Sequence, residues 1–83
     1  MKYKIAFKKS VARDLKRIGK PQAKWILDKI ENELVTKANR YPELKGQFAG
    51  LRKCRIGAYR VIFVLINDTI LITRIGHRKE VYR

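Results

Sequence analysis

Negative charge is scarce in this chain. Its 83 residues include 7 Asp and Glu against 21 Lys and Arg, which gives a formal net charge of +14. A net charge of about 2 to 8 is enough to keep a small domain soluble, and a larger like charge destabilises the compact state. The excess therefore predicts an anionic partner, either a nucleic acid or an acidic protein.

Cysteine, histidine and long apolar runs are scarce as well. The single cysteine permits no internal disulfide, and together with the single histidine it cannot supply a zinc site, so we expect neither a metal nor another cofactor. No stretch approaches the ~20 apolar residues of a membrane span, and the N-terminus has no signal-peptide pattern. The sequence predicts a cytoplasmic protein with no membrane partner.

The composition is that of one folded domain. Hydrophobic residues make up 46% of the chain, which is enough to offset the entropy lost on ordering. A chain this short buries only about 60 to 65% of its unfolded surface. We therefore expect a single domain over residues 1–83 with one modest core.

The first half of the sequence predicts a strand followed by a helical hairpin. Residues 3–7 alternate between apolar and other side chains, as in a half-buried strand. A first helix follows, with Ser10 as its candidate cap, and Gly19 and Pro21 separate it from a second helix. The apolar stripe of the second helix comprises Ala23, Ile26, Leu27, Ile30 and Leu34.

The second half predicts three strands joined by tight turns. A loop over residues 39–50 leads into a strand over residues 51–57. Residues 59–66 are apolar on both faces, which is typical of a central strand. Asn67-Asp68 favours a tight turn into a last strand over residues 69–75.

This order predicts an α+β fold in which an N-terminal strand, a two-helix hairpin and an antiparallel three-stranded meander follow one another. Both helices would pack on one face of a mostly antiparallel sheet. Lys53 and Arg55 share one face of their strand, with Cys54 on the other, and Arg60 begins the neighbouring strand. Pairing of these strands would gather three cations, which makes this open face a candidate anion site.

A combination of motifs runs through Leu44-Lys45-Gly46, Leu51-Arg52-Lys53-Cys54-Arg55-Ile56-Gly57-Ala58-Tyr59-Arg60-Val61-Ile62-Phe63 and Arg74-Ile75-Gly76-His77-Arg78-Lys79-Glu80-Val81-Tyr82-Arg83. With these motifs the chain resembles the RelE toxins of the RelE/ParE superfamily, and the resemblance covers essentially the whole chain. It implies a RelE-like fold and a toxin of a type II toxin–antitoxin pair that cleaves messenger RNA in the ribosomal A site. It also implies two partners, a cognate antitoxin and the ribosome, and the charge of +14 predicts that the antitoxin is acidic.

The resemblance also implies which residues carry the reaction. Metal-free RNA cleavage needs a base for the 2′-hydroxyl, positive charge for the phosphorane oxygens and an acid or cation for the leaving 5′-oxygen. The base would be Tyr82 or Lys53, and the chemistry leaves the choice open. The other candidates are Arg55 for phosphate binding, Arg60 for the transition state, Arg78 for the leaving group and His77 as a proton donor. The best-studied relatives have lysine at the position of Arg55.

Two other functions stay open on the sequence. A ParE-like toxin that inhibits DNA gyrase would share the fold without needing the full set of cations and tyrosine. A non-catalytic nucleic-acid-binding module is disfavoured because aromatic stacking platforms are not evident. The sheet offers Tyr59 and Phe63, and Phe63 is expected in the core.

Overall fold

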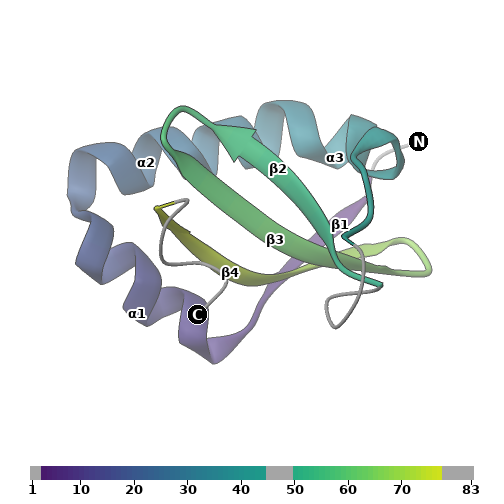
Figure 1. Ribbon diagram of the computed structural model, residues 1–83, viewed down its shortest axis with the longest axis horizontal. Helices are drawn as coiled ribbons and strands as arrows, with labels where there is room; N and C mark the ends of the chain where they lie inside the picture. The colour runs from purple at the N-terminus through teal and green to yellow at the C-terminus, as the bar shows by residue number, and fades with distance from the viewer. Residues whose placement is uncertain (1–2, 45–49, 78–83) are drawn as a thin grey trace.

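The computed structural model describes residues 3–44 and 50–77 of the chain. Helices and strands account for most of these residues (Figure 1). In chain order the elements are β1 (Lys4–Phe7), α1 (Lys9–Ile18), α2 (Lys20–Lys29), a π-helical segment (Ile30–Leu34), α3 (Val35–Lys37), a 3₁₀ turn (Ala38–Arg40), β2 (Arg52–Ile56), β3 (Tyr59–Ile66) and β4 (Thr69–His77).

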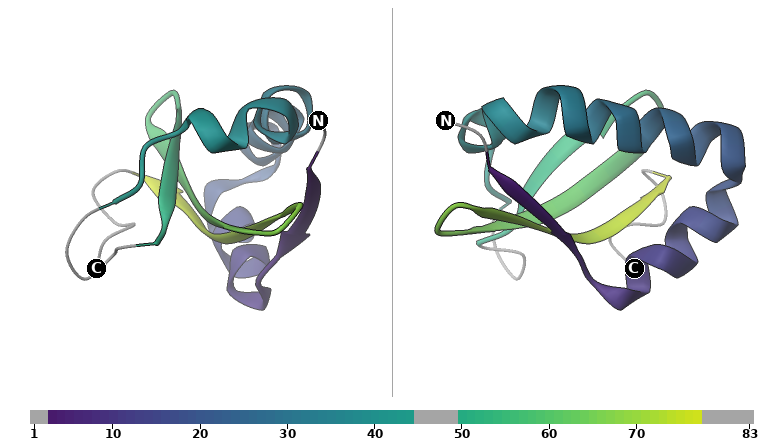
Figure 2. Two further views of the ribbon diagram at one scale, coloured as in Figure 1. Left: turned by 90° about the vertical axis from the view of Figure 1, so that its right-hand side faces the viewer. Right: turned by 180° about the vertical axis from the view of Figure 1, so that it is seen from behind.

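The strands form one four-stranded sheet in the order β1-β4-β3-β2. The antiparallel meander of β2, β3 and β4 confirms the prediction, and β3 is central as expected. The first strand β1 joins the other side of β4 in parallel, with Lys4 opposite Thr69 and Phe7 opposite Ile72. The sheet twists around α2 and its helical continuation (Figure 2). The predicted α+β class with a helical hairpin against the sheet is therefore confirmed.

The predicted break between the two helices occurs at Gly19. This residue has φ +99°, and its N–H donates to the carbonyl of Leu15 at 3.1 Å, which ends α1. Pro21 lies in the first turn of α2, where its missing N–H costs nothing.

The prediction that Ser10 caps the first helix was wrong. Helix α1 already begins at Lys9, and the capping position belongs to Lys8, which makes no side-chain cap hydrogen bond. The N–H of Lys8 instead donates to the carbonyl of Ile72 in the sheet at 2.9 Å. The hydroxyl of Ser10 donates to the carbonyl of Thr73 at 3.3 Å, so Ser10 fastens α1 to β4.

A π-helical segment interrupts the long second helix. Its buried residues recur every fourth position, at Ile26, Ile30, Leu34 and Ala38, all 0 to 1% exposed. A four-residue repeat drifts by ~40° per step around an ideal α-helix, because four residues exceed one turn of 3.6. A wider π turn corrects this drift. The segment Ile30–Leu34 therefore keeps one apolar face against the sheet over the whole helical run.

Trp25 covers the turn between β2 and β3. It is 43% exposed, and a Cβ atom placed on Gly57 would lie 2.8 Å from Cη2 of its indole ring. Gly57 also has φ +60°, in the left-handed region that disfavours other residues. The turn therefore needs glycine for two separate reasons.

Replacing Gly57 with alanine should lower the free energy of unfolding by about 2 to 4 kcal/mol, from left-handed strain and from the clash with the indole ring. A double-mutant cycle with Trp25→Ala separates the two contributions. In the Trp25→Ala background the cost should fall to about 1 to 2 kcal/mol, because only the backbone strain remains. Urea unfolding of the four proteins measures both numbers, and equal costs in the two backgrounds would show that the indole ring does not constrain the turn.

Candidate functional site

The β2–β3 hairpin brings three cations together on the face that points away from the core. Arg55 lies opposite Arg60 in the ladder, and Lys53 lies opposite Ile62, one pleat further along. Cys54 is buried on the other face of the same strand. Like charges directly opposite each other destabilise a sheet, so this arrangement favours an anion between them.

These cations line a cavity of about 290 Å³. Its lining residues are Tyr41, Pro42, Lys53, Arg55 and Arg60, and we call it the cation pocket. None of the five is acidic. Arg55 is exposed, whereas Lys53 and Arg60 are half-buried. The pocket therefore offers partly desolvated positive charge, which binds phosphate oxygens more strongly than a fully hydrated surface does.

The chain before β2 forms one wall of the cation pocket. The N–H of Lys53 donates to the carbonyl of Pro42 at 3.3 Å, and the N–H of Leu44 donates to the carbonyl of Leu51 at 2.7 Å. This stretch fell within the predicted loop over residues 39–50. Its described part instead lies along the edge of β2, held by backbone hydrogen bonds.

The side chain of Arg52 also holds the chain before β2 in place. Its Nη1 donates to the carbonyl of Tyr41 at 2.6 Å and to that of Asn39 at 3.4 Å. Although Arg52 precedes Lys53 in the sequence, it points to the other face of β2 and does not line the cation pocket. It is a positioning residue for Tyr41 and Pro42, which sequence reasoning did not identify.

Tyr41 is anchored between the wall and the core. Its ring packs edge-to-face on Phe63, with the ring centroids 6.2 Å apart, and its hydroxyl donates a hydrogen bond to the sulfur of Cys54. Burial, followed by that hydrogen bond, raises the pKa of Tyr41 to about 12. The hydroxyl therefore stays protonated at neutral pH, so Tyr41 does not act as a base. Burial also raises the pKa of the Cys54 thiol, which keeps it protonated.

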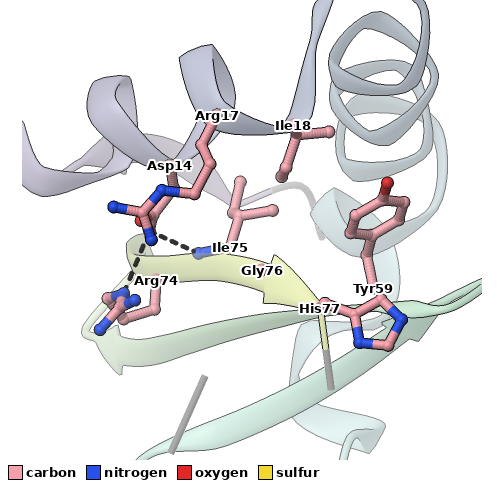
Figure 3. A pocket seen from close by; sticks show the side chains of 8 residues that line it. All are labelled: Asp14, Arg17, Ile18, Tyr59, Arg74, Ile75, Gly76 and His77. Atoms are coloured by element: carbon pink, nitrogen blue, oxygen red, sulfur yellow. Dashed lines mark hydrogen bonds and ion pairs between the residues drawn. The ribbon is translucent and has the colours of Figure 1, made fainter. Parts of the chain in front are cut away.

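His77 lies in a second cavity, of about 260 Å³, between α1 and the end of β4 (Figure 3). It is paired with Tyr59 across the β3–β4 ladder, and the two rings meet edge-to-face at 6.2 Å. Arg60, the next residue along β3, points to the opposite face of the sheet. The structure therefore places His77 apart from Lys53, Arg55 and Arg60. The second cavity is lined by Asp14, Arg17, Ile18, Tyr59, Arg74, Ile75, Gly76 and His77.

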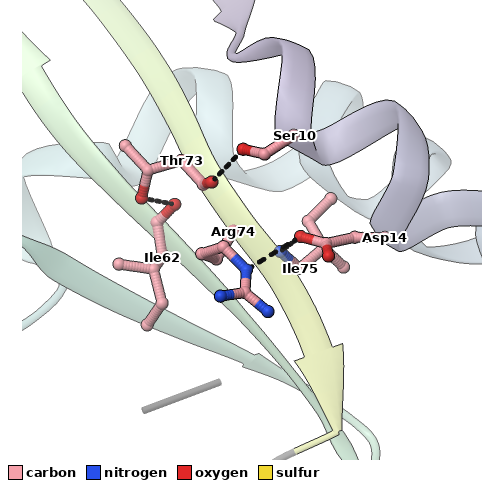
Figure 4. Close-up of polar contacts among 6 residues, drawn as sticks. All are labelled: Ser10, Asp14, Ile62, Thr73, Arg74 and Ile75. Atoms are coloured by element: carbon pink, nitrogen blue, oxygen red, sulfur yellow. Dashed lines mark hydrogen bonds and ion pairs between the residues drawn. The ribbon is translucent and has the colours of Figure 1, made fainter. Parts of the chain in front are cut away.

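Asp14 ties α1 to β4 at the other end of this cavity (Figure 4). Its Oδ2 accepts hydrogen bonds from Nε of Arg74 at 3.1 Å and from the N–H of Ile75 at 3.0 Å. Sequence reasoning missed this buried carboxylate. The signal was its position, because Asp14 lies on the same helical face as Val11 and Ile18, where an acid is unexpected unless it has a partner.

Two of the predicted site residues, Arg78 and Tyr82, lie outside the described residues. Within residues 3–44 and 50–77, no cluster of His, Cys, Asp and Glu could hold a metal ion. Across the same ranges, no helix is both long and apolar enough to cross a membrane.

Solved structures share this fold over nearly the whole chain. The chain is similar to a protein from the RelBE2 toxin–antitoxin complex of Mycobacterium tuberculosis, with 23% identity and a TM-score of 0.87 over 94% of this chain and 100% of that one. A chain of the archaeal RelE–RelB complex from Pyrococcus horikoshii has 27% identity and a TM-score of 0.67, covering 96% and 99%. A mutant of the E. coli toxin RelE in the free state has 18% identity and a TM-score of 0.71, covering 93% and 84%.

These solved structures and this chain share one fold, with helices against a four-stranded mixed sheet. A family model described as ParE toxin of the type II toxin–antitoxin system parDE matches residues 5–82. The chain therefore belongs to this family of type II toxins. Among proteins with curated descriptions, none matches the chain.

Proposed function

We propose that this toxin is an endoribonuclease that cleaves messenger RNA in the ribosomal A site and thereby stops translation. The observation that carries the proposal is the convergence of Lys53, Arg55 and Arg60 on one cavity. A purely structural sheet would not gain from three cations in one pocket, whereas an RNA phosphate would be bound by all of them. The solved relatives include toxins named RelE.

The proposed reaction needs no metal ion. The 2′-oxygen of the substrate ribose attacks the adjacent phosphorus, and the bond from phosphorus to the 5′-oxygen breaks, leaving a 2′,3′-cyclic phosphate and a 5′-hydroxyl. Arg60 would stabilise the negative charge that develops on the phosphorane oxygens, while Arg55 binds the same phosphate. The proton of the 2′-hydroxyl passes to a base, and another proton or a cation neutralises the leaving oxygen.

The base in this proposal is Tyr82 or Lys53. Tyr41 is excluded from that role because its pKa lies near 12. Lys53 lines the cation pocket, so its amine is within the site. Arg78 would stabilise the leaving oxygen. His77 remains a proposed proton donor, although its ring lies in the second cavity rather than in the cation pocket.

The proposed partners follow from charge and from the relatives. RelE-type relatives were solved in complex with antitoxins, and we propose that this toxin also has a cognate antitoxin. That antitoxin would be acidic, because a partner of opposite charge best neutralises the toxin's net charge of +14. The site of action would be the cytoplasm, where ribosomes present the message.

Incubation with translating ribosomes tests the proposal. Mapping the 5′ ends of the message should reveal new ends within the A-site codon, each with a 5′-hydroxyl, and a zinc-specific chelator should not abolish them. Magnesium is kept high enough to hold the ribosomes intact. Intact messages under these conditions would refute the proposed activity.

A second function is favoured by one finding, since the matching family model is that of ParE toxins. In that case the target would be DNA gyrase rather than the ribosome. Supercoiling by purified gyrase in the presence of the toxin separates the two functions. Inhibited gyrase together with intact messages would select the second one.

A further inference from the structure

The second cavity holds two arginines and a single carboxylate. Arg17 reaches it from α1 and Arg74 from β4, and Figure 3 shows both at the end of the cavity where Asp14 lies. Tyr59 and His77 line the other end. Asp14 is the only acid among the described residues that line the cavity. Positive charge therefore exceeds negative charge within this lining.

Asp14 neutralises only one of the two arginines. Its Oδ2 lies 3.1 Å from Nε of Arg74, and the same oxygen accepts the N–H of Ile75 at 3.0 Å. Arg17 belongs to none of the ion pairs found between described residues. It is also exposed, so a ligand can reach its guanidinium from solvent. One positive charge is therefore left for a ligand, and a group with one negative charge would balance it.

A phosphate of RNA matches both this charge and the donors around it. Each phosphodiester link carries one negative charge, and planar guanidinium groups bind phosphate oxygens through paired N–H donors. The bond to Asp14 uses the Nε–H of Arg74 and leaves the terminal nitrogens of that guanidinium for a ligand. We propose that the second cavity binds one phosphate of an RNA strand through Arg17 and these terminal nitrogens of Arg74.

This phosphate differs from the one that is cut. Arg60 follows Tyr59 in β3 and points to the opposite face of the sheet, so the second cavity and the cation pocket open on different faces. The inference rests on the proposed ribonuclease function and deepens it, because it adds a contact that holds RNA without taking part in the cleavage. Message and ribosomal RNA present the same phosphate chemistry, and the two binding experiments distinguish these sources.

Asp14 makes the site rigid before RNA arrives. Its hydrogen bonds fix both the guanidinium of Arg74 and the backbone of Ile75, and its side chain is only 8% exposed, so water competes little for these bonds. Ile18 and Ile75 add carbon surface between the charged groups and the aromatic rings. A guanidinium fixed beside an apolar surface loses little entropy on binding and is screened less than one on the open surface.

Ribosome binding measures the contribution of Arg17. The probe is a ribosome programmed with a message whose A-site codon carries 2′-O-methyl groups, so the toxin binds without cutting. At about 150 mM salt, Arg17→Ala should weaken binding by about fivefold or more, because a charged hydrogen bond is lost. The slope of log affinity against log salt should become shallower by about 0.7 to 0.9, the contribution of one phosphate contact.

Arg13→Ala is the matched control for charge. It removes an exposed arginine from the same helix, and Arg13 lines neither cavity. Its affinity should change by less than about twofold, since the charge is remote and screened. In the cleavage assay, the loss in Arg17→Ala should appear in the toxin concentration needed for half-maximal cleavage, whereas Arg60→Ala lowers the rate at saturation. Urea unfolding confirms that each variant is folded.

A free RNA strand identifies the source of the phosphate. The probe is a 2′-O-methyl RNA of about eight nucleotides, in which each phosphate in turn is replaced by an uncharged methylphosphonate. A linkage whose replacement weakens binding of the wild type but not of Arg17→Ala assigns the cavity to a single strand such as the message. An Arg17 effect on ribosomes without such a linkage in the free strand assigns it to ribosomal RNA.

Two outcomes overturn the inference. One is unchanged binding of Arg17→Ala in both experiments, which would leave an acidic side chain of the antitoxin as the competing occupant. The other is an equal loss in Arg13→Ala, which would make the effect one of overall charge. Failure of the proposed function has a different signature. If Arg17→Ala weakens ribosome binding but unmodified messages stay intact with the wild type, the ribonuclease proposal fails while the cavity assignment stands. If messages are cleaved and Arg17 does not affect binding, only the cavity assignment fails.

Discussion

Replacing Arg60 with alanine is expected to slow message cleavage on the ribosome by about 10²- to 10³-fold, the loss typical of removing one transition-state donor. Arg60 is half-buried in the cation pocket, opposite Arg55, so water cannot substitute fully for its guanidinium. Single-turnover cleavage with the variant in excess over ribosomes measures the chemical step directly. Thermal unfolding of the same preparation shows whether the fold is intact.

Two control variants define what the result means. Arg60→Lys keeps the charge but loses the planar bidentate donor, so its rate should fall between those of wild type and Arg60→Ala. Arg13→Ala removes an exposed arginine of helix α1 that lines neither cavity, and it should cleave near the wild-type rate. A folded Arg60→Ala protein with wild-type cleavage would remove Arg60 from the site. An equal loss in Arg13→Ala would attribute the effect to overall charge.

The second large effect is expected at Asp14, in stability rather than activity. Asp14→Ala should lower the free energy of unfolding by about 2 to 4 kcal/mol, because the buried N–H of Ile75 loses its acceptor and Arg74 loses a charged hydrogen bond. The Arg74 side chain is 37% exposed, so water recovers part of that second loss. A domain of this size shifts its melting temperature by about 4 to 8 °C per kcal/mol, so a fall of at least about 8 °C is expected.

Two aspartate variants test the cause of this loss. Asp14→Asn keeps an oxygen acceptor for the N–H of Ile75 and removes only the charge, so it should cost less than Asp14→Ala. Asp28→Ala removes an exposed aspartate from helix α2 and should change stability by no more than about 0.5 kcal/mol. Equal losses in all three variants would show that the buried hydrogen bonds of Asp14 are not what stabilises the fold.

The hairpins of this fold could be predicted because their signals are local. The two-residue period of Lys53, Cys54 and Arg55 sets which side chains face the core, and a slip of one residue would bury two cations. Asn67 adopts φ +56° in the β3–β4 turn, a conformation that asparagine tolerates well. The clustering of Lys53 and Arg55 with Arg60 followed from the same local rules.

The features that join distant segments could not be predicted in this way. Asp14 and Arg74 are 60 residues apart, and no local pattern indicates that they meet. The contact of Tyr41 with Phe63 and Cys54 depends equally on how the chain before β2 returns to the sheet. Sequence reasoning therefore found the cations of the pocket and missed the wall that completes it.

The parallel pairing of β1 with β4 joins the first and the last strand, in chain order, of the described residues. During synthesis the first strand leaves the ribosome early, yet its partner is the last strand of the sheet. A polypeptide released from a broken message before β4 is made therefore leaves β1 unpaired and lacks the anchor of Asp14 on Arg74 and Ile75. The four-stranded order of the described sheet can therefore form only after Thr69–His77 has been synthesised.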